Sequence, residues 1–255
     1  MKNISFLFKY LKYLLSAKTA HGIHSPFVFE LYNAVINKKS NYYIFEKIEH
    51  LRKKLLISQK EIDVTDLGTG KSGKRMVRDI AERSAKDKKY CALLFRLAYH
   101  FKPTTILELG TSLGISTAYL ASSNLNSKVI TIEGCPNTAS EARKNFQSLD
   151  LQNIESITGN FDDVLCQLPI ANCQLVFFDG NHKKEPTLKY FSQCLEFAHT
   201  HSVFVFDDIH WSDEMEEAWE EIKSHPKVTV SIDLFFMGLI FFRKEQAKEH
   251  FVVRY

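Results

Sequence analysis

The chain has 255 residues, with 33 Lys and Arg against 30 Asp and Glu and a net charge of +3. Its 45% hydrophobic and 13% aromatic residues exclude global disorder, and its 10 Gly and 6 Pro exclude a collagen-like or low-complexity chain. A chain of this length forms one large domain or one domain with a small extension, and it can fold without a metal or disulfides.

The charges are unevenly distributed along the chain. Residues 1–102 contain 21 Lys and Arg against 9 Asp and Glu, whereas residues 103–255 contain 12 against 21. A basic segment suits nucleic acid, an anionic lipid surface or an acidic substrate. We favour a plainer interpretation, in which a solvated basic helical face complements an acidic partner domain.

The cysteines and the N-terminus indicate a compartment. Five scattered cysteines contain no C-x-x-C pair, which argues against a disulfide framework or a zinc site and favours a reducing environment. The apolar run Phe6–Leu15 is short and interrupted by Lys9 and Lys12, which is atypical of a signal peptide. No stretch approaches the roughly 18 apolar residues of a transmembrane helix. We therefore expect a cytoplasmic protein without a transmembrane segment.

The first hundred residues predict helices. Ser25 and Pro26 are a plausible N-cap and first-turn pair for one of them. The helix-compatible stretches are 5–15, 26–36, 44–57 and 75–101, the last ending before Pro103. We treat residues 1–100 as a helical N-terminal extension, acting as a lid or an oligomer contact.

From Thr105 onward, short β-branched runs alternate with amphipathic stretches. The expected strands are Thr105–Leu109, Lys128–Ile132, Ile154–Thr158, Leu175–Phe178, Ser202–Phe206, Val228–Ile232 and Leu239–Phe242. The expected helices are 115–123, 138–149, 162–167, 185–199 and 213–224. This alternation predicts an α/β fold with a mostly parallel seven-stranded sheet, over residues 101–255. The short link between the last two strands predicts an antiparallel edge hairpin.

A glycine turn follows the first strand, where open α/β sheets bind ligands. Its pattern is E-x-G-x-x-x-G, formed by Glu108, Gly110 and Gly114. A dinucleotide fingerprint would have glycine where Ser112 stands, so an NAD-dependent oxidoreductase is disfavoured. Glu133 ends the second strand, where a carboxylate can accept both ribose hydroxyls. The pattern suits a nucleoside with an amino-acid tail.

These motifs resemble the class I S-adenosylmethionine (SAM)-dependent methyltransferases, in particular the catechol/macrolide O-methyltransferase-like branch, over about residues 90–255. The resemblance implies a Rossmann-like, doubly wound fold, SAM as cofactor and O-methyltransferase activity. It also implies that Gly110, Ser112 and Gly114 line the methionine and ribose portions of SAM. In the same way, Ser116 would hold the SAM carboxylate, and Glu108 would fix the loop or the amino group.

A second loop would read the adenine. The relatives have a Gly-Asp pair where this chain has Gly159 and Asn160, whose amide oxygen can still accept from the adenine amino group. The full predicted cofactor set is Glu108, Gly110, Thr111, Ser112, Gly114, Ser116, Glu133, Asn160, Phe161 and Asp179.

Acidic residues follow the fourth and fifth strands. Asp179, Asp207 and Asp208 should converge, because parallel neighbours end at the same edge of a sheet. Such carboxylates repel unless a cation intervenes, and oxygen ligands suit Mg²⁺ or another divalent ion. The resemblance implies the same metal set, with His182 where D-x-x-H relatives place a base. Metal-free base catalysis by His182 or His210, or a capping role for Asp208, stays open. The predicted catalytic set is Asp179, His182, Asp207 and His210.

Three further features have open roles. The loop Asp66–Gly73 looks like a phosphate loop but has Thr65 where glycine is required, so it is a flexible connection or a lid. The pair His21 and His24 is more typical of a turn than of a metal site. A set of aromatic residues could line an acceptor pocket but is more typical of a core. That set is Trp211, Trp219, Phe235 and Phe236.

We therefore predict a SAM-dependent O-methyltransferase of a small hydroxylated molecule, assisted by Mg²⁺, with a homodimer as one expected assembly. Nucleic acid is not the expected partner, because the chain lacks a base-reading motif and aromatic–basic interleaving. The alternatives are a nucleic-acid methyltransferase that uses the basic N-terminal half and a non-catalytic Rossmann-like binding module.

Overall fold

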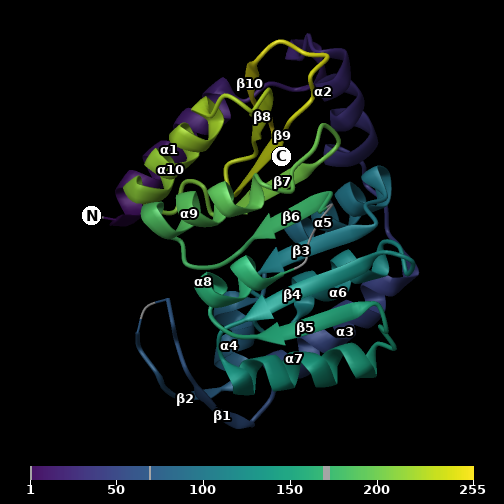
Figure 1. Ribbon diagram of the computed structural model, residues 1–255, viewed down its shortest axis with the longest axis vertical. Helices are drawn as coiled ribbons and strands as arrows, with labels where there is room; N and C mark the ends of the chain where they lie inside the picture. Colours follow the sequence, from purple (N-terminus) through teal and green to yellow (C-terminus); the bar gives the residue numbers. More distant parts are fainter. Residues whose placement is uncertain (1, 69, 169–172) are drawn as a thin grey trace. The chain divides into compact units, whose positions relative to one another are not determined.

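The computed structural model describes residues 2–68, 70–168 and 173–255 (Figure 1). Contacts divide the chain into two compact units, residues 39–170 and residues 1–38 with 171–255. The boundaries between these units lie near residues 38 and 170 and not near residue 100 as expected. The first helices belong to the same unit as the last strands. The assignment of an extension and a catalytic domain therefore stays a prediction.

The unit of residues 39–170 contains a parallel sheet in the order β3-β4-β5, seen side by side in Figure 1. These strands are β3 (Thr105–Leu109), β4 (Lys128–Glu133) and β5 (Ile154–Thr158). Helices α6 (Ile115–Ser122) and α7 (Pro136–Ser148) connect consecutive strands, as parallel pairing requires. The other helices of this unit are α3 (Tyr43–Leu56), α4 (Val77–Ser84), α5 (Lys88–Phe101) and α8 (Phe161–Val164), the last followed by a 3₁₀ turn at Leu165–Gln167.

The same unit contains an antiparallel hairpin that the sequence did not predict. Its strands are β1 (Glu61–Val64) and β2 (Gly73–Met76), and Figure 1 shows them near α4 and α7. The continuous helix expected over 75–101 is wrong, because β2, α4 and α5 occupy that range. The side chain of Asp87 accepts a hydrogen bond from the Lys89 amide at 2.7 Å and caps a new helix.

The other unit contains strands in the order β10-β8-β9-β7-β6. They are β6 (Leu175–Phe178), β7 (Val203–Asp207), β8 (Val230–Asp233), β9 (Met237–Phe241) and β10 (Glu249–Val252). The parallel pair β6/β7 and the antiparallel hairpin β8/β9 confirm the expected pairings, but the hairpin is not at the edge of the sheet as expected, because β10 lies outside β8. The unpredicted β10 pairs in parallel with β8. The mixed α/β class is therefore confirmed.

The helices of this unit include the N-terminal ones. They are α1 (Lys2–Ser16), a 3₁₀ turn (Ala20–Gly22), α2 (Pro26–Leu31) continued by a π-helical turn (Tyr32–Ile36), α9 (Lys184–Cys194) and α10 (Asp213–Ser224). Ser25 Oγ accepts a hydrogen bond from the Val28 amide, which confirms the predicted cap of α2. Tyr10 and Tyr13 of α1 contact Phe235 with ring centroids 4.8 and 5.3 Å apart. Aromatic packing thus holds α1 within the unit.

The cysteines and the exposed residues relate to the expected compartment and the expected homodimer. All five cysteines are free thiols. In the part of the chain that the structure describes, no helix has both the length and the apolar character needed to cross a membrane. One side of α1 exposes Phe8 and Leu15 among other apolar residues. The expected homodimer stays a prediction.

Candidate active site

The glycine turn between β3 and α6 is tied to the neighbouring strand. Gly110 has φ 108° and Gly114 has φ 82°, a backbone region that favours glycine. The Gly110 and Thr111 amides both donate to the Ile132 carbonyl of β4. A Cβ atom on Gly114 would lie 2.3 Å from the Phe146 ring, so packing also requires glycine there. The turn is therefore a fixed structure and not a loose connection.

Glu133 closes this turn from the end of β4. Its Oε2 accepts a hydrogen bond from the Ser112 amide at 2.8 Å, and its Oε1 accepts one from the Cys135 amide at 2.9 Å. Burial raises the pKa of Glu133, while these amide hydrogen bonds oppose the shift. Each carboxylate oxygen keeps a further lone pair, so two more donors can bind. This is the capacity that a ribose diol requires.

Glu108 lies beneath the turn and is fully buried. Its Oε2 accepts hydrogen bonds from Thr117 of α6 and, at 2.7 Å, from Thr131 of β4. Its Oε1 has no hydrogen-bond partner among the described residues. Burial raises the pKa of Glu108 to about 7. Glu108 therefore fixes the start of α6, where the buried Ser116 lies, and retains one acceptor for a donor.

Asn160 lies at the start of α8 and acts as its cap. Its Oδ1 accepts a hydrogen bond from the Asp162 amide at 3.2 Å. The predicted contact with adenine would use the same oxygen, which retains a second lone pair. Phe161 follows as the first residue of α8 and is half-buried.

In the other unit, acidic side chains gather after β6 and β7. The two strands pair in register at Phe178 and Phe206, so Asp179 and Asp207 follow at the same edge. His182 Nε2 lies 3.6 Å from Asp179 Oδ1. The ligand atoms of Asp179, His182 and Asp207 all lie within 4.8 Å of one another. Two carboxylates and one imidazole can hold a divalent cation.

Asp208 does not belong to that group. Its backbone has φ 53°, its amide donates to the Phe236 carbonyl at 2.7 Å, and its carbonyl accepts from the Trp211 amide. The left-handed backbone at Asp208 begins a turn, and His182 takes the third place in the cluster. The side chains that the structure brings together are Asp179, His182 and Asp207, and the expected metal set with Asp208 stays a prediction.

His210 has no free ring nitrogen. Nδ1 lies 2.8 Å from Glu216 Oε1, and Nε2 lies 2.8 Å from Asp233 Oδ2. The ring stacks on Phe235 with centroids 5.0 Å apart. Burial lowers the pKa of His210, but the hydrogen bonds to Asp233 and Glu216 raise it overall above its usual value. Both nitrogens of His210 therefore bind carboxylates, and its expected role as a base stays a prediction.

The aromatic residues are divided between core and surface. Trp219 and Phe235 are buried, and a Cβ atom on Gly238 would lie 2.5 Å from the Trp219 ring. Trp211 is exposed. Trp219 and Phe235 are therefore core residues, the alternative that the sequence favoured.

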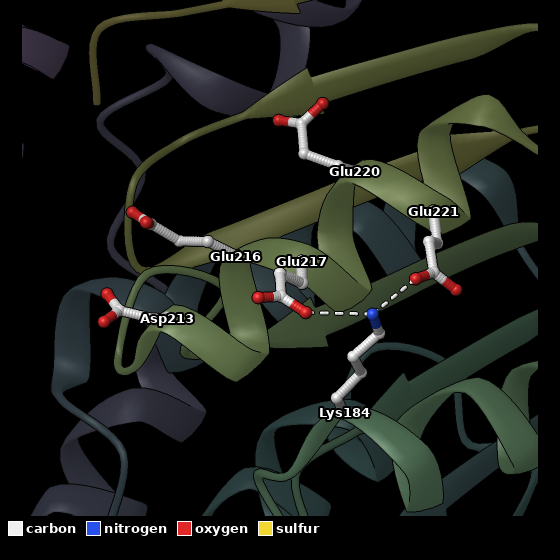
Figure 2. A pocket seen from close by; sticks show the side chains of 6 residues that line it. All are labelled: Lys184, Asp213, Glu216, Glu217, Glu220 and Glu221. Atoms are coloured by element: carbon white, nitrogen blue, oxygen red, sulfur yellow. Dashed lines mark hydrogen bonds and ion pairs between the residues drawn. The ribbon is translucent and has the colours of Figure 1, made fainter.

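A shallow acidic groove of about 460 Å³ follows α10 in the same unit (Figure 2). Figure 2 shows Lys184 of α9 reaching Glu217 and Glu221 of α10, at 2.9 and 2.6 Å. These ion pairs raise the pKa of Lys184. The remaining lining residues are Asp213, Glu216 and Glu220. None of the residues predicted for catalysis lines this groove, so it is a solvated helix face.

Several residues around the glycine turn were missed by the sequence prediction. Thr117 and Thr131 hold Glu108, and Ser84 Oγ lies 2.7 Å from Ser112 Oγ. Leu67 lies against Gly134. Thr117 lies only nine residues after Glu108, beside the predicted Ser116, whereas no local signal marks Thr131, Ser84 and Leu67, which come from other elements.

Comparisons with known proteins agree with this arrangement. Residues 107–209 match a family model described as a methyltransferase domain. The search of curated proteins found no match.

Solved structures share the fold. Cofactor-bound Rv0187 from MTB is 24% identical, with a TM-score of 0.58 over 63% of this chain and 83% of that one. An O-methyltransferase from Bacillus cereus in complex with SAH is 18% identical, with a TM-score of 0.58 over 79% and 92%. The O-methyltransferase TomG from Streptomyces achromogenes, in complex with SAM, is 18% identical, with a TM-score of 0.58 over 85% and 95%.

The family match gives the activity class of residues 107–209, and the solved structures give the fold. The resemblance predicted from the glycine turn and Glu133 is confirmed. Residues 107–209 thus match a methyltransferase domain, and the chain has the fold of solved SAM- and SAH-bound O-methyltransferases.

Proposed function

We propose that this chain transfers a methyl group from SAM to a hydroxyl of a small molecule, assisted by a divalent cation. The observation that carries the proposal is the bridge from Glu133 to the Ser112 amide, which joins the glycine turn to a carboxylate suited to ribose. Solved O-methyltransferases with SAM or SAH bound share the fold and support the same cofactor.

The residues around the turn fit SAM. Glu133 would accept the two ribose hydroxyls with its remaining lone pairs. Glu108 has a buried oxygen without a partner among the described residues, which suits a donor such as an amino-acid ammonium. Ser116 is buried in the first turn of α6, where a helix N-terminus favours a carboxylate.

The cluster of Asp179, His182 and Asp207 fits a divalent cation with oxygen and imidazole ligands. A bound ion of this kind lowers the pKa of a coordinated hydroxyl and orients substrate oxygens. The protein contributes by fixing the two aspartates through strand register. Because these ligands are fixed, orienting the acceptor for the reaction costs less entropy.

Metal-free catalysis is the second candidate, and one observation favours His182 for it. His182 Nε2 faces Asp179 at 3.6 Å, so the carboxylate can orient the ring. His210 lacks this role because both of its nitrogens bind carboxylates. When bound, SAM supplies a methyl group already activated on sulfonium. The chain therefore has to align one oxygen, exclude water and accept one proton.

Calorimetric titration tests the cofactor. We expect SAM and SAH to bind and NAD not to bind, because Ser112 occupies the position where a pyrophosphate loop has glycine. Absence of SAM binding at about 100 µM, a weak affinity for a cofactor, would refute the proposal.

Chelation tests the cation. We expect EDTA to abolish methyl transfer to a catechol-like probe and Mg²⁺ to restore it, while SAH binding stays unchanged. Full turnover in EDTA would instead support His182 as the base.

The cellular setting follows from the sequence and stays part of the proposal. The five free thiols are compatible with the reducing cytoplasm that the cysteine pattern predicts. A small-molecule acceptor is preferred to nucleic acid. Binding of RNA with a steep salt dependence would overturn that preference.

A further inference from the structure

One segment near the glycine turn has no role in the proposed function. It comprises residues 60–68 and 70–84, which form β1, β2 and α4, and we call it the hairpin segment. It contains the loop that looked like a phosphate site in the sequence. It belongs to the same compact unit as Gly110 and Glu133.

The first anchor of the hairpin segment is the loop that follows Glu133. The Thr65 amide donates to Cys135 Sγ at 3.3 Å, and the Asn137 amide group donates to the Asp63 carbonyl at 2.8 Å. Lys60 forms an ion pair with Glu141 of α7. These contacts hold β1 beside the end of β4.

Leu67 lies at the centre of this contact. A Cβ atom on Gly134 would lie 2.9 Å from Leu67 Cδ1 and 3.3 Å from Leu67 Cγ. Gly134 directly follows Glu133, so Leu67 fills the space that a side chain there would take. Leu67 is nevertheless 53% exposed. A large apolar side chain thus lies exposed beside the residue that follows Glu133, whose carboxylate is proposed for ribose.

The second anchor is on the glycine turn. Ser84 Oγ donates to the Ile80 carbonyl at 2.7 Å, so its single proton is already used. The 2.7 Å contact between Ser84 Oγ and Ser112 Oγ therefore has Ser112 as donor. The end of α4 fixes the Ser112 hydroxyl, and Ser112 keeps its lone pairs for a ligand. The hairpin segment consequently contacts both loops that surround the proposed nucleoside site.

We propose that the hairpin segment forms the nucleoside-side wall of the cofactor site, with Leu67 packing on the adenosine of SAM. This inference rests on the proposed function. A nucleobase presents an apolar face, and burying the exposed part of a leucine against it favours binding. The anchors on Cys135, Asn137 and Ser112 hold the wall in place, so little ordering entropy opposes that binding.

The first experiment measures dissociation constants by calorimetry for SAH and for 5′-methylthioadenosine, which has the nucleoside without the amino-acid tail. We expect Leu67→Ala to weaken both ligands about tenfold, because the lost contact is with the nucleoside. Leu125→Ala is the matched control, since Leu125 is also an exposed leucine of this unit, and it should change neither constant. Thermal unfolding of the free variants reports any loss of stability separately.

The second experiment is a double-mutant cycle. Gly134→Ala should weaken SAH about threefold, because the added methyl group displaces Leu67. In the Leu67→Ala background, the same change should have no effect on SAH affinity. Its cost should therefore depend on the leucine.

The outcomes separate the two proposals. If the unmodified protein binds neither SAH nor SAM, the proposed function fails. If it binds SAH but Leu67→Ala binds equally well, only the wall is refuted. Weaker SAH binding with unchanged methylthioadenosine binding would also refute it, because Leu67 would then act on the tail.

Discussion

Two D-x-x-H segments follow adjacent parallel strands, and their histidines have different partners in the structure. Asp179 and His182 follow β6, whereas Asp207 and His210 come at the end of β7. Both segments contain a residue with left-handed backbone, Asn181 in the first and Asp208 in the second. His182 turns back to its own aspartate, while His210 turns away and binds Glu216 and Asp233.

The difference shows that a polar residue after a strand is free for chemistry only when its hydrogen bonds are not already used. His210 is held by carboxylates on both nitrogens, and Lys9 of α1 lies 2.9 Å from Glu216 Oε2. The ring also stacks on Phe235, which contacts Tyr10 and Tyr13 of α1. His210 therefore stabilises the packing of the N-terminal helix, which leaves His182 as the histidine of the proposed reaction.

The largest expected effect is a loss of kcat on replacing the aspartates of the two segments, Asp179 and Asp207. Asp179→Asn and Asp207→Asn should each lower kcat for methyl transfer by about 100-fold or more, because each removes a charged ligand from the cluster. Steady-state rates over a Mg²⁺ titration measure the effect. For Asp207→Asn, which lies outside the predicted cofactor set, SAH affinity should stay within about twofold as the control for folding. Unchanged rates in both variants would contradict the metal cluster.

Replacing His182 should affect mainly the rate of methyl transfer, and replacing His210 should affect mainly the stability of the fold. His210→Gln should lower the free energy of unfolding by about 2 kcal/mol, because it leaves two partly buried carboxylates without their cation. His182→Gln should lower kcat at least about tenfold and leave stability within about 0.5 kcal/mol. Urea unfolding and initial rates on both variants test the contrast. The reverse pattern would exchange the two assignments.

The pH dependence of stability should sharpen the same contrast. The pKa of His210 is raised in the folded state, so the folded protein binds the proton more tightly. Its stabilising contribution is complete below the usual histidine pKa of about 6.5 and is lost as pH rises through the folded pKa. The stability difference between the native protein and His210→Gln should therefore shrink with rising pH. A difference that grows with pH would show the wrong sign.

The smallest effect is expected at Asp208, which the sequence placed among the metal ligands. Asp208→Asn should keep the left-handed backbone, since asparagine tolerates it, and should change kcat by less than about threefold. The same assay as for Asp207→Asn provides the comparison. A loss as large as that of Asp207→Asn would restore Asp208 to the cluster.

Much of the fold was predictable because local patterns determine it. The strands Thr105–Leu109, Ile154–Thr158 and Leu175–Phe178 and the helix Asp213–Ser224 have the predicted limits. The strands that the sequence did not predict have only a weak hydrophobic pattern. The strand Glu249–Val252 is short and partly exposed, and the hairpin strand Glu61–Val64 has only two buried residues.

The candidate site was only partly predictable. The positions of Glu108, Glu133, Asp179 and Asp207 at strand ends follow from alternation and turn chemistry. Their partners do not, because Thr131, Ser84 and Leu67 reach the site from other elements. The break before α5 could have been found, since Asp87 is a standard helix cap.

The sequence by itself determined the α/β class, the glycine turn and the acidic strand ends, because these depend on periodicity and on residues adjacent in the chain. Only the tertiary structure decided that His210 binds two carboxylates while His182 lies beside its own aspartate. It also decided that Leu67 lies against Gly134, the residue after Glu133. Both outcomes depend on side chains brought together from distant positions in the chain. A polar group whose hydrogen bonds are already made within the fold is not available to a substrate.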